Sequence, residues 1–398
     1  MDLIDRLRRI AGEPGERPRR ARASTPIDEL VGGQWIENEH GRCLLASARF
    51  ALDHRHGHTA LRVALDDGPG LLALAGLDGD LERLLFLDTE TTGLGRDAGT
   101  VAFLVGVGSY DEGWFTVRQY FMDDVDDELA LLGELEGELA RRPTLVTFNG
   151  TGFDWPLLVN RYLFNGWPPP TLAGHLDLLR WSRSLWRNVL PSCALSALEG
   201  SILGVTRSQE DVPGYLIPQL YYDYLRTGDA RPLEGVFYHN LMDVLSMACL
   251  LARVARSLAV AQALEPQAPH DPLAVGRLHE RLGRNEEALA AYAAAAQSAA
   301  PTLAAAAWDC HSLLLKRLGR LDEAAAVWRQ HLDGPSATPV IELAKYLEHR
   351  ERDYAAAREI VLRGMAAVEA GRICTPWPAE LLAELAHRLE RLERRLSR

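Results

Sequence analysis

LLFLDTETTGL, residues 84–94, joins four apolar residues to two carboxylates and a Thr-Thr-Gly turn. The apolar run predicts a short buried strand that ends near Asp88. Asp88 and Glu90 stand two positions apart, so on a strand both point to the same face, where they repel each other unless a cation lies between them. Mg²⁺ and Mn²⁺ prefer oxygen ligands of this kind. A DxE pair by itself is more often a solvated turn, but the whole string DTETTGL is much rarer, so the question is whether further acids of a metal site are present.

The composition bounds the class of protein. The chain has 398 residues, 47% hydrophobic and 25% charged, which predicts a globular protein of two or more units. No apolar run is long enough to span a bilayer and the N-terminus lacks an apolar signal core, so we expect a cytoplasmic protein without a membrane partner. The five cysteines form no CxxC pair, which argues against a disulfide framework or a zinc site. The net charge of −12 argues against a general nucleic-acid coat but is compatible with a nuclease that has local basic patches.

Two segments precede the acidic strand. Residues 1–26 are rich in Arg, Pro and Gly, which predicts a disordered basic tail, with a phosphate-contacting arm as the alternative. Residues 27–80 alternate apolar and polar positions between glycine turns and predict a small β element. Its HxHxH string, His54, His56 and His58, would align three imidazoles on a strand. Gly57 interrupts the run and no acid or thiol partner is obvious, so a metal site there is not favoured.

The acidic strand is followed by further alternating elements. Residues 101–110 and 114–122 flank an Asp-Glu-Gly turn and predict a hairpin. Residues 126–140 carry leucines at helical spacing, and residues 144–148 predict another strand. The resulting order, β, β, β, α, β, α, predicts a ribonuclease H-like fold in which a mixed sheet is flanked by helices.

A third acid follows the strand at residues 144–148. In TFNGTGFDWP, residues 147–156, Asp154 lies just before Trp155 and Pro156, so it can be read as a helix N-cap. Ligands also bind at the carboxyl ends of strands in open sheets. Asp154 is therefore a candidate metal ligand as well, and Asn149 would lie beside it.

A basic and aromatic segment covers residues 175–187, HLDLLRWSRSLWR. Arg180, Arg183 and Arg187 are spaced so that they share one face of a helix, which favours contact with a phosphate backbone, although arginines also simply solvate helix faces. Asp177 would either orient the site from behind or cap the next helix.

The fourth acid lies in an apolar helix predicted over residues 236–255. Asp243 follows His239 by four residues, so the two side chains would lie one turn apart on one face. A surface ion pair is the alternative, but the stretch is too apolar for an exposed face. Because the pKa of histidine lies near neutrality, His239 could accept a proton from an attacking water.

The four acids resemble those of the DnaQ-like (DEDD) exonuclease superfamily. The longer strings LFLDTETTGL, TFNGTGFDWPLL, HLDLLRWSRSLWR, VPGYLIP and YHNLMDVLSM are similar to the YprB-type ribonuclease H-like family, over about residues 29–260. One departure concerns the base. The superfamily places His five or Tyr four residues before the last Asp, whereas here Tyr238 stands at minus five and His239 at minus four. The YprB-type pattern HNxxD is satisfied by His239, Asn240 and Asp243.

The last third of the chain is alanine-rich and helical in pattern. LGRNEEALAAY at residues 282–292 recurs as LGRLDEAAAVW at 318–328, a period of 318 − 282 = 36 residues, and a weaker copy lies at 352–361. This resembles tetratricopeptide repeats. We expect a linker over residues 263–272 and paired-helix repeats over 273–398, serving either as a surface for a protein partner or as support for the neighbouring domain.

The resemblance implies that residues 81–262 form a metal-dependent nuclease, most readily a 3′ to 5′ exonuclease acting on single-stranded DNA or RNA. It implies two Mg²⁺ or Mn²⁺ ions held by four acids: Asp88, Glu90, Asp154 and Asp243. His239 would be the base, with Tyr238 the alternative. Further residues are expected to bind substrate or adjoin the site: Thr91, Asn149, Arg180, Arg183, Arg187, Asp177, Tyr238 and Asn240. The alternatives are a non-catalytic adaptor and a structure-specific endonuclease.

Overall fold

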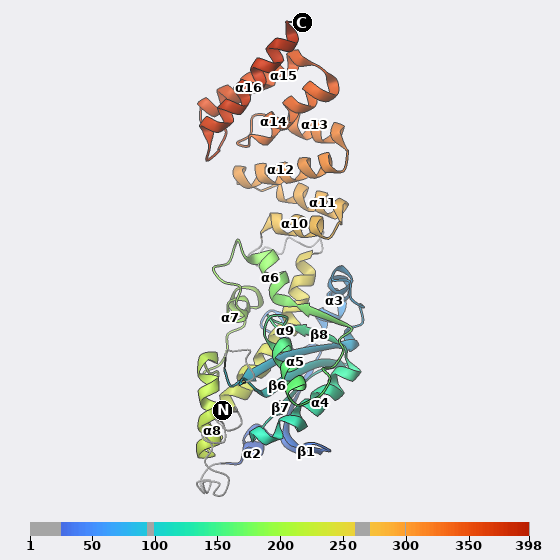
Figure 1. Cartoon of the computed structure of the whole chain (residues 1–398), viewed down its shortest axis with the longest axis vertical. Coiled ribbons are helices and arrows are strands. Elements are labelled where there is room, and N and C mark those ends of the chain that lie inside the picture. The colour runs from blue at the N-terminus through green and yellow to red at the C-terminus, as the bar shows by residue number, and fades with distance from the viewer. Residues whose placement is uncertain (1–24, 94–98, 259–270, 299, 398) are drawn as a thin grey trace. The chain divides into compact units, whose positions relative to one another are not determined.

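The computed structural model describes residues 25–93, 99–258, 271–298 and 300–397. The chain divides into two compact units, Met1–Pro269 and His270–Arg398 (Figure 1). The predicted basic tail lies outside the described residues except for its last two, and the predicted linker except for residues 271 and 272. None of the described helices is long and apolar enough to cross a membrane.

A seven-stranded mixed sheet with the order β1-β2-β7-β6-β5-β8-β9 forms the first unit. Its strands are β1 (Gln34–Asn38), β2 (Gly41–Ala51), β5 (Leu84–Thr91), β6 (Ala102–Asp111), β7 (Trp114–Phe121), β8 (Thr144–Thr147) and β9 (Gly174–Asp177). β5, β8 and β9 run parallel, and the remaining neighbours are antiparallel. This confirms the predicted ribonuclease H-like mixed sheet.

The hairpin of β6 and β7 forms as predicted from its turn. Asp111 pairs with Trp114, and the two residues between them, Glu112 and Gly113, have φ angles of 42° and 85°. A two-residue turn with both φ angles positive matches the twist of the flanking strands. The hairpin places β6 beside the acidic strand β5.

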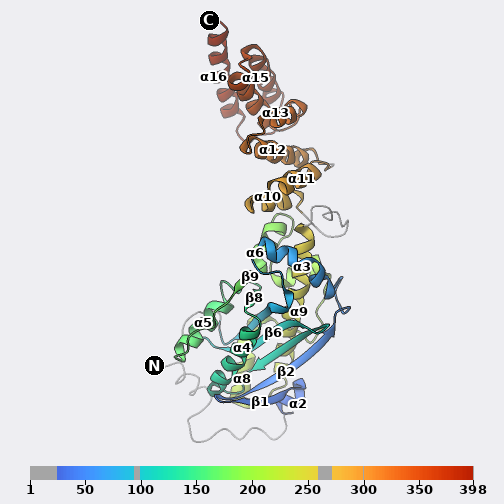
Figure 2. The same cartoon turned by 90° about the vertical axis from the view of Figure 1, so that its right-hand side faces the viewer.

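Residues 27–80 extend the main sheet. β2 lies beside β1 (Figure 2). β2 also pairs with β7 over eight residues, and Leu44 and Phe121 of this pairing are both fully buried. The segment also contains α2 (Ile27–Val31), α3 (Arg62–Leu74) and a short hairpin of β3 (Arg55–His56) and β4 (Thr59–Ala60). The sequence pattern predicted strands here but not their partner, because pairing depends on β7, about seventy residues further along.

Helices cover both faces of the sheet. Gln119 of β7 contacts α9 (Leu233–Leu258), whereas its neighbour Tyr120 contacts α4 (Glu128–Arg141). Because successive residues of a strand point to opposite faces, α9 and α4 lie on opposite faces of the sheet. Four further helices belong to this unit: α5 (Asp154–Phe164), α6 (Leu178–Trp186), α7 (Leu195–Leu198) and α8 (Ile217–Thr227). Short turns of 3-10 or π helix also occur: η1 (Leu81–Arg83), η2 (Val125–Asp127), η3 (Glu199–Leu203) and η4 (Gly214–Leu216).

The second unit is entirely helical in its described part. It consists of α10 (Pro272–Arg281), α11 (Asn285–Ala295), α12 (Pro301–Arg317), α13 (Leu321–Gln330), α14 (Thr338–Tyr346), η5 (Leu347–Glu351), α15 (Tyr354–Glu369) and α16 (Pro378–Leu396). Each α-helix packs against the next one in the chain. The small residues that recur in the predicted repeats, Ala288, Ala324 and Ala357, are fully buried. Paired helices are therefore confirmed, and the tetratricopeptide assignment stays a prediction.

Candidate active site

Strand β5 carries two acids on the face that α9 covers. Asp88 is partly buried, and Glu90 is only 9% exposed. Asp88 pairs with Gly106 of β6, and a register shift follows between Glu90 and Thr91. Such β-bulges locally redirect side chains at the ends of strands. The strand therefore places two carboxylates together where its regular pairing ends.

Asn240 of α9 holds Asp88 in place. Its Nδ2 donates to Asp88 Oδ2 at 2.8 Å, and its Oδ1 accepts from Gln119 Nε2 at 2.9 Å. Both bonds are buried or nearly so, and Asn240 itself is completely buried. Asn240 thus connects Gln119 of β7 with Asp88 of β5 and fixes the orientation of one carboxylate oxygen of Asp88.

The same helix supplies Asp243 and His239. Asp243 Oδ2 lies 3.7 Å from His239 Nε2, as expected for side chains one helical turn apart. Asp243 is close enough to Asp88 that its carboxylate contributes to the raised pKa of Asp88. Helix α9 therefore brings the predicted fourth acid and the predicted base to the acids of β5.

Asp154 reaches this region from the opposite face of the sheet. It is the first residue of α5, 6% exposed, and its Oδ1 accepts the hydroxyl proton of Thr89 at 2.5 Å. Thr89 stands between Asp88 and Glu90 on β5, so its side chain points away from theirs. Asp154 is near enough to both acids to influence their ionisation, but its carboxylate is turned toward Thr89.

Burial and neighbouring carboxylates disfavour ionisation in this group of acids, and Asp88 and Glu90 are both affected by Asp154 and Asp243. Burial raises the pKa of Asp88 well above its ordinary value, and Asp243 adds to this rise. Burial likewise raises the pKa of Glu90 to about 8 and that of Asp154 to about 6. The pKa of Asp243 is raised by burial too, although Arg207 opposes the rise. Four buried or partly buried acids with raised pKa values form a site at which positive charge would be stabilised.

The donor chemistry fits a hard divalent cation, because oxygen ligands predominate and their charges repel. The geometry is not that of a ready-made cage. Within the described ranges, no three His, Cys, Asp or Glu side chains are grouped closely enough to hold a metal ion. The physical reason is that protein donors engage the carboxylates: Asn240 for Asp88, Thr89 for Asp154 and Arg207 for Asp243.

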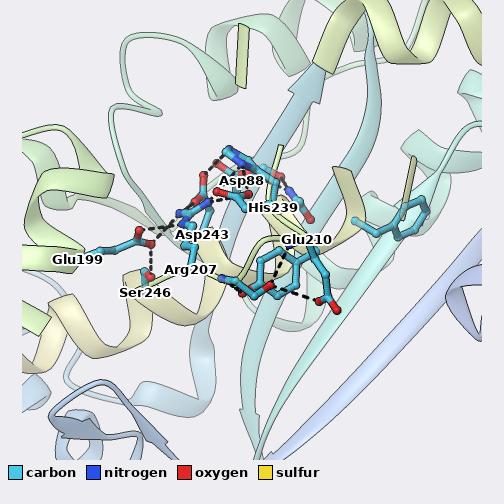
Figure 3. Close-up of polar contacts among 12 residues, drawn as sticks. Asp88, Glu199, Arg207, Glu210, His239, Asp243 and Ser246 are labelled. Carbon is cyan, nitrogen blue, oxygen red and sulfur yellow. Dashed lines mark hydrogen bonds and ion pairs between the residues drawn. The ribbon is translucent and has the colours of Figure 1, made fainter. Parts of the chain in front are cut away.

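Arg207 is the main residue of the site that the motifs did not single out. Its Nε and Nη2 donate to the two carboxylate oxygens of Glu199 at 2.8 and 2.7 Å, and Nη2 also donates to Asp243. Figure 3 shows the guanidinium between these two acids. Bidentate pairing with a carboxylate holds an arginine in one orientation. Arg207 therefore places a fixed positive charge beside the carboxylate of Asp243.

Asp211 contacts the predicted base. Its Oδ1 lies 2.8 Å from His239 Nδ1, whereas the phenol of Tyr238 accepts a hydrogen bond from the backbone amide of Ser208. The two candidate bases therefore have different surroundings. His239 faces Asp243, and Tyr238 faces the loop that follows η3.

Asp177 organises the turn that leads to Asp154. It caps α6 through the Leu179 amide, and it also accepts from the amides of Asn149 and Thr151 at 2.8 and 3.2 Å. Asn149 is exposed with a φ of 68°. Asp177 therefore caps α6 and joins its start to the turn after β8, and its role in orienting the site stays a prediction.

The remaining predicted substrate-binding residues differ in exposure. Thr91 is 7% exposed, and its hydroxyl donates to the Gly93 carbonyl. Arg180, Arg183 and Arg187 are all exposed on or just after α6, while Trp186 of the same helix is 2% exposed. Helix α6 packs against α9, so its arginines lie on the unit that carries the acids.

The HxHxH string does not align its imidazoles. His56 is 5% exposed, whereas His54 and His58 are exposed. His56 Nε2 lies 2.8 Å from the hydroxyl of Ser246, which donates to Glu199. His56 is thus a buried support of the acid that holds Arg207, and burial lowers its pKa to about 4.

Four contributing residues escaped sequence reasoning: Glu199, Arg207, Asp211 and Gln119. The string RSQEDVPGYLIP contains Arg207 and Asp211, but nothing in its spacing connects it with α9. Arg207 contacts Asp243 across 36 positions and Asp211 contacts His239 across 28, and both Arg207 and Asp211 lie in a loop without a periodic pattern. A local signal for them was therefore absent.

Fold and site together define a ribonuclease H-like protein with a buried acidic centre. In agreement, a profile of the RNase_H superfamily matches residues 85–255, which include all four acids. The uncharacterized protein YprB of Bacillus subtilis (strain 168) is 32% identical over 337 residues, covering 82% of this chain and 80% of that relative. The chain belongs to the same family as YprB.

Proposed function

We propose that this protein is a metal-dependent nuclease that hydrolyses phosphodiester bonds, acting as a 3′ to 5′ exonuclease. The observation that carries the proposal is the proximity of four acids from β5, α5 and α9, of which Glu90 and Asp154 are buried and Asp88 and Asp243 partly buried, to a histidine. Burying such a group of carboxylates is unfavourable unless a cation is bound there. Membership of a ribonuclease H-like family supports the same class of chemistry.

Asp88, Glu90 and Asp243 would hold two Mg²⁺ or Mn²⁺ ions, with Asp154 completing the second position. Bound ions of this kind stabilise the attacking and leaving oxygens of an in-line displacement. To act as a ligand, Asp154 would have to turn away from Thr89. The carboxylate of Asp243 would have to bind the metal ion in addition to Arg207. His239 would accept the proton of the attacking water through Nε2, the nitrogen that faces Asp243.

The nucleic-acid strand would be bound outside the acidic centre by the arginines of α6. Arg180, Arg183 and Arg187 are exposed, and no ion pair with an acid engages them within the described residues. Free guanidinium groups at this spacing can contact successive phosphates of a strand. They would orient the strand without reading its sequence.

The test is hydrolysis of 3′-labelled and 5′-labelled single-stranded DNA and RNA by the full chain in Mn²⁺, Mg²⁺ or EDTA. Metal-dependent release of mononucleotides from the 3′ end is expected, and it should be lost in Asp88→Ala. Glu82→Gln is the matched control, because Glu82 is an exposed acid just before the same strand. Internal cuts would indicate an endonuclease, and full activity of Asp88→Ala would refute the site.

A non-catalytic adaptor is the second candidate, because no metal-ready group exists among the described side chains and Arg207 already neutralises Asp243. Such a protein would bind single strands with equal affinity in EDTA and in Mn²⁺ and would cleave none of them. Its partner would then be sought at the second, helical unit. Measuring binding and cleavage on the same labelled strands separates the two candidates.

A further inference from the structure

We propose that Asp211 is a positioning residue that fixes the tautomer of His239, and that Arg207, anchored by Glu199, holds Asp211 and Asp243 on either side of the ring. The proposal rests on the nuclease function above. It adds to that function the arrangement that keeps Nε2 of His239 free of a proton and turned toward Asp243.

The first step concerns Nδ1 of His239, which has two neighbours. Asp211 Oδ1 lies at 2.8 Å and Arg207 Nη1 at 3.2 Å. A carboxylate can only accept a hydrogen bond and a guanidinium can only donate one, so the two contacts demand opposite tautomers. If Nδ1 were unprotonated, its lone pair would face the carboxylate of Asp211 at the shorter distance. The geometry therefore favours a proton on Nδ1 that is donated to Asp211.

The second step concerns Nε2, which is unprotonated once Nδ1 carries the proton of the neutral ring. This nitrogen lies 3.7 Å from Asp243 Oδ2. Gly214 also lies near this nitrogen, because a Cβ there would stand 3.8 Å from Nε2. Glycine therefore adds no side chain next to Nε2.

The third step concerns what holds Asp211 itself. Arg207 Nη1 lies 3.6 Å from Asp211 Oδ1, while Nε and Nη2 of the same guanidinium are bound to Glu199. Glu199 is 2% exposed and also accepts the hydroxyl proton of Ser246 at 2.5 Å. Because a guanidinium is planar and rigid, anchoring one edge fixes the direction of the other. The loop that bears Asp211 is thus tied to the acid centre through a buried support. Figure 3 shows Glu199, Ser246, Arg207 and Asp243 of this network.

The tautomer can be measured without catalysis. The full chain is labelled with ¹⁵N-histidine, and two-bond ¹H–¹⁵N correlations are recorded in EDTA at about pH 8.5, where a free imidazole is neutral. His239→Gln identifies the signals of His239 among the 12 histidines. We expect protonated Nδ1 and unprotonated Nε2 in the wild type, and a shift toward the opposite tautomer in Asp211→Ala.

Glu210→Ala is the matched control, because Glu210 is the adjacent acid, is exposed and contacts Ser208 rather than the histidine. It should leave the tautomer unchanged, and Asp211→Glu should restore it in part. A wild-type ring protonated on Nε2 would overturn the proposal, and so would an Asp211→Ala ring that keeps its proton on Nδ1. If Asp211→Ala does not fold, the wild-type spectrum still tests the proposal, because it shows which ring nitrogen of His239 carries the proton.

Kinetics provide the second readout. Losing an oriented base costs on the order of 100-fold or more in rate. Asp211→Ala should therefore lower kcat by about 100-fold with KM changed less than about 2-fold, while Glu210→Ala stays near the wild type. A rise in KM alone would overturn the positioning role. If the wild type shows the expected tautomer but cleaves no substrate, the nuclease function fails and the Asp211 contact stands.

Discussion

Gly106 lies directly against Asn240, so that a Cβ on Gly106 would stand 2.0 Å from the amide oxygen of Asn240. The neighbouring glycine on the same strand face, Gly108, is similarly close to Val244 of α9. These two glycines let α9 approach β6 closely enough for Asn240 to reach Asp88. The position of the acidic centre thus depends on the absence of two side chains.

Gly106→Ala is expected to destabilise the protein by about 1–3 kcal/mol, the usual cost of overpacking a core. The added methyl group would displace Asn240, so cleavage should also fall. The measurement is urea unfolding together with the cleavage assay. Gly137→Ala is the control, because Gly137 lies within helix α4 with open space around its Cβ. It should be neutral or stabilise by up to about 1 kcal/mol. Equal effects of both substitutions would contradict the packing argument.

Asp88→Asn should make the metal-free protein more stable while abolishing cleavage. Asp88 is disfavoured as a carboxylate by burial and by Asp243, Glu90 and Asp154, so its replacement relieves a destabilising group, and single stabilising substitutions commonly yield about 0.5–2 kcal/mol. Thermal unfolding in EDTA measures this gain. Adding Mn²⁺ should raise the melting temperature of the wild type more than that of Asp88→Asn. A variant that loses stability in EDTA would show that Asp88 is mainly structural.

The metal-free protein should lose stability between about pH 6.5 and 8. Burial raises the pKa of Glu90 from 4.5 to about 8 in the folded state, so in this range the folded chain retains a proton that the unfolded chain has lost. Stability therefore falls as pH rises. The pKa of His56 is lowered from 6.5 to about 4, so His56 makes stability rise with pH, but only below about pH 6.5.

Urea unfolding in EDTA at several pH values measures this slope, and Glu90→Gln should flatten it. Mg²⁺ or Mn²⁺ should offset the loss increasingly toward high pH, because carboxylates bind metals in their deprotonated form. An unfolding free energy that does not change over this range in the wild type would rule out the raised pKa.

Arg183→Ala should weaken binding of single-stranded nucleic acid and reduce its salt dependence. Each lost phosphate contact lowers the slope of log affinity against log salt by about 0.7. Fluorescence anisotropy with a labelled strand in EDTA measures both quantities. Arg372→Ala, an exposed arginine of the helical unit, is the control. Unchanged slopes in the single variant and in the triple variant of Arg180, Arg183 and Arg187 would remove α6 from the binding surface.

Ser246→Ala tests the support beneath Arg207. His56 and Glu199 would each lose a buried hydrogen-bond partner, which costs about 1–3 kcal/mol. Ser257→Ala is the control on the same helix, because among the described residues the Ser257 hydroxyl bonds to the backbone carbonyl of Arg253, one turn before it. Its replacement should be nearly neutral. Urea unfolding compares the two, and similar stabilities would show that the His56 contact contributes nothing.

Much of the fold followed from local pattern. The predicted hairpin, the helix after it and the apolar helix with Asp243 appear as β6, β7, α4 and α9, each within a few residues of its expected bounds. Alternation, leucine spacing and turn residues act over a few positions, so they can be recognised without knowing the partner segment. The HxHxH string shows the limit of such reasoning, because its regular spacing placed one imidazole in the core and left the other two exposed.

The sequence by itself determined which strand and helix carry the acids, since side-chain direction follows from the periods of strand and helix. Only the tertiary structure decided what holds them. Asn240 reaches Asp88 across 152 positions, Thr89 reaches Asp154 across 65, and Asp211 meets His239 across 28. Such contacts depend on how α9 and the loop after η3 pack on the sheet. That packing is set by buried side chains and glycines distributed along the chain, and no local period encodes it.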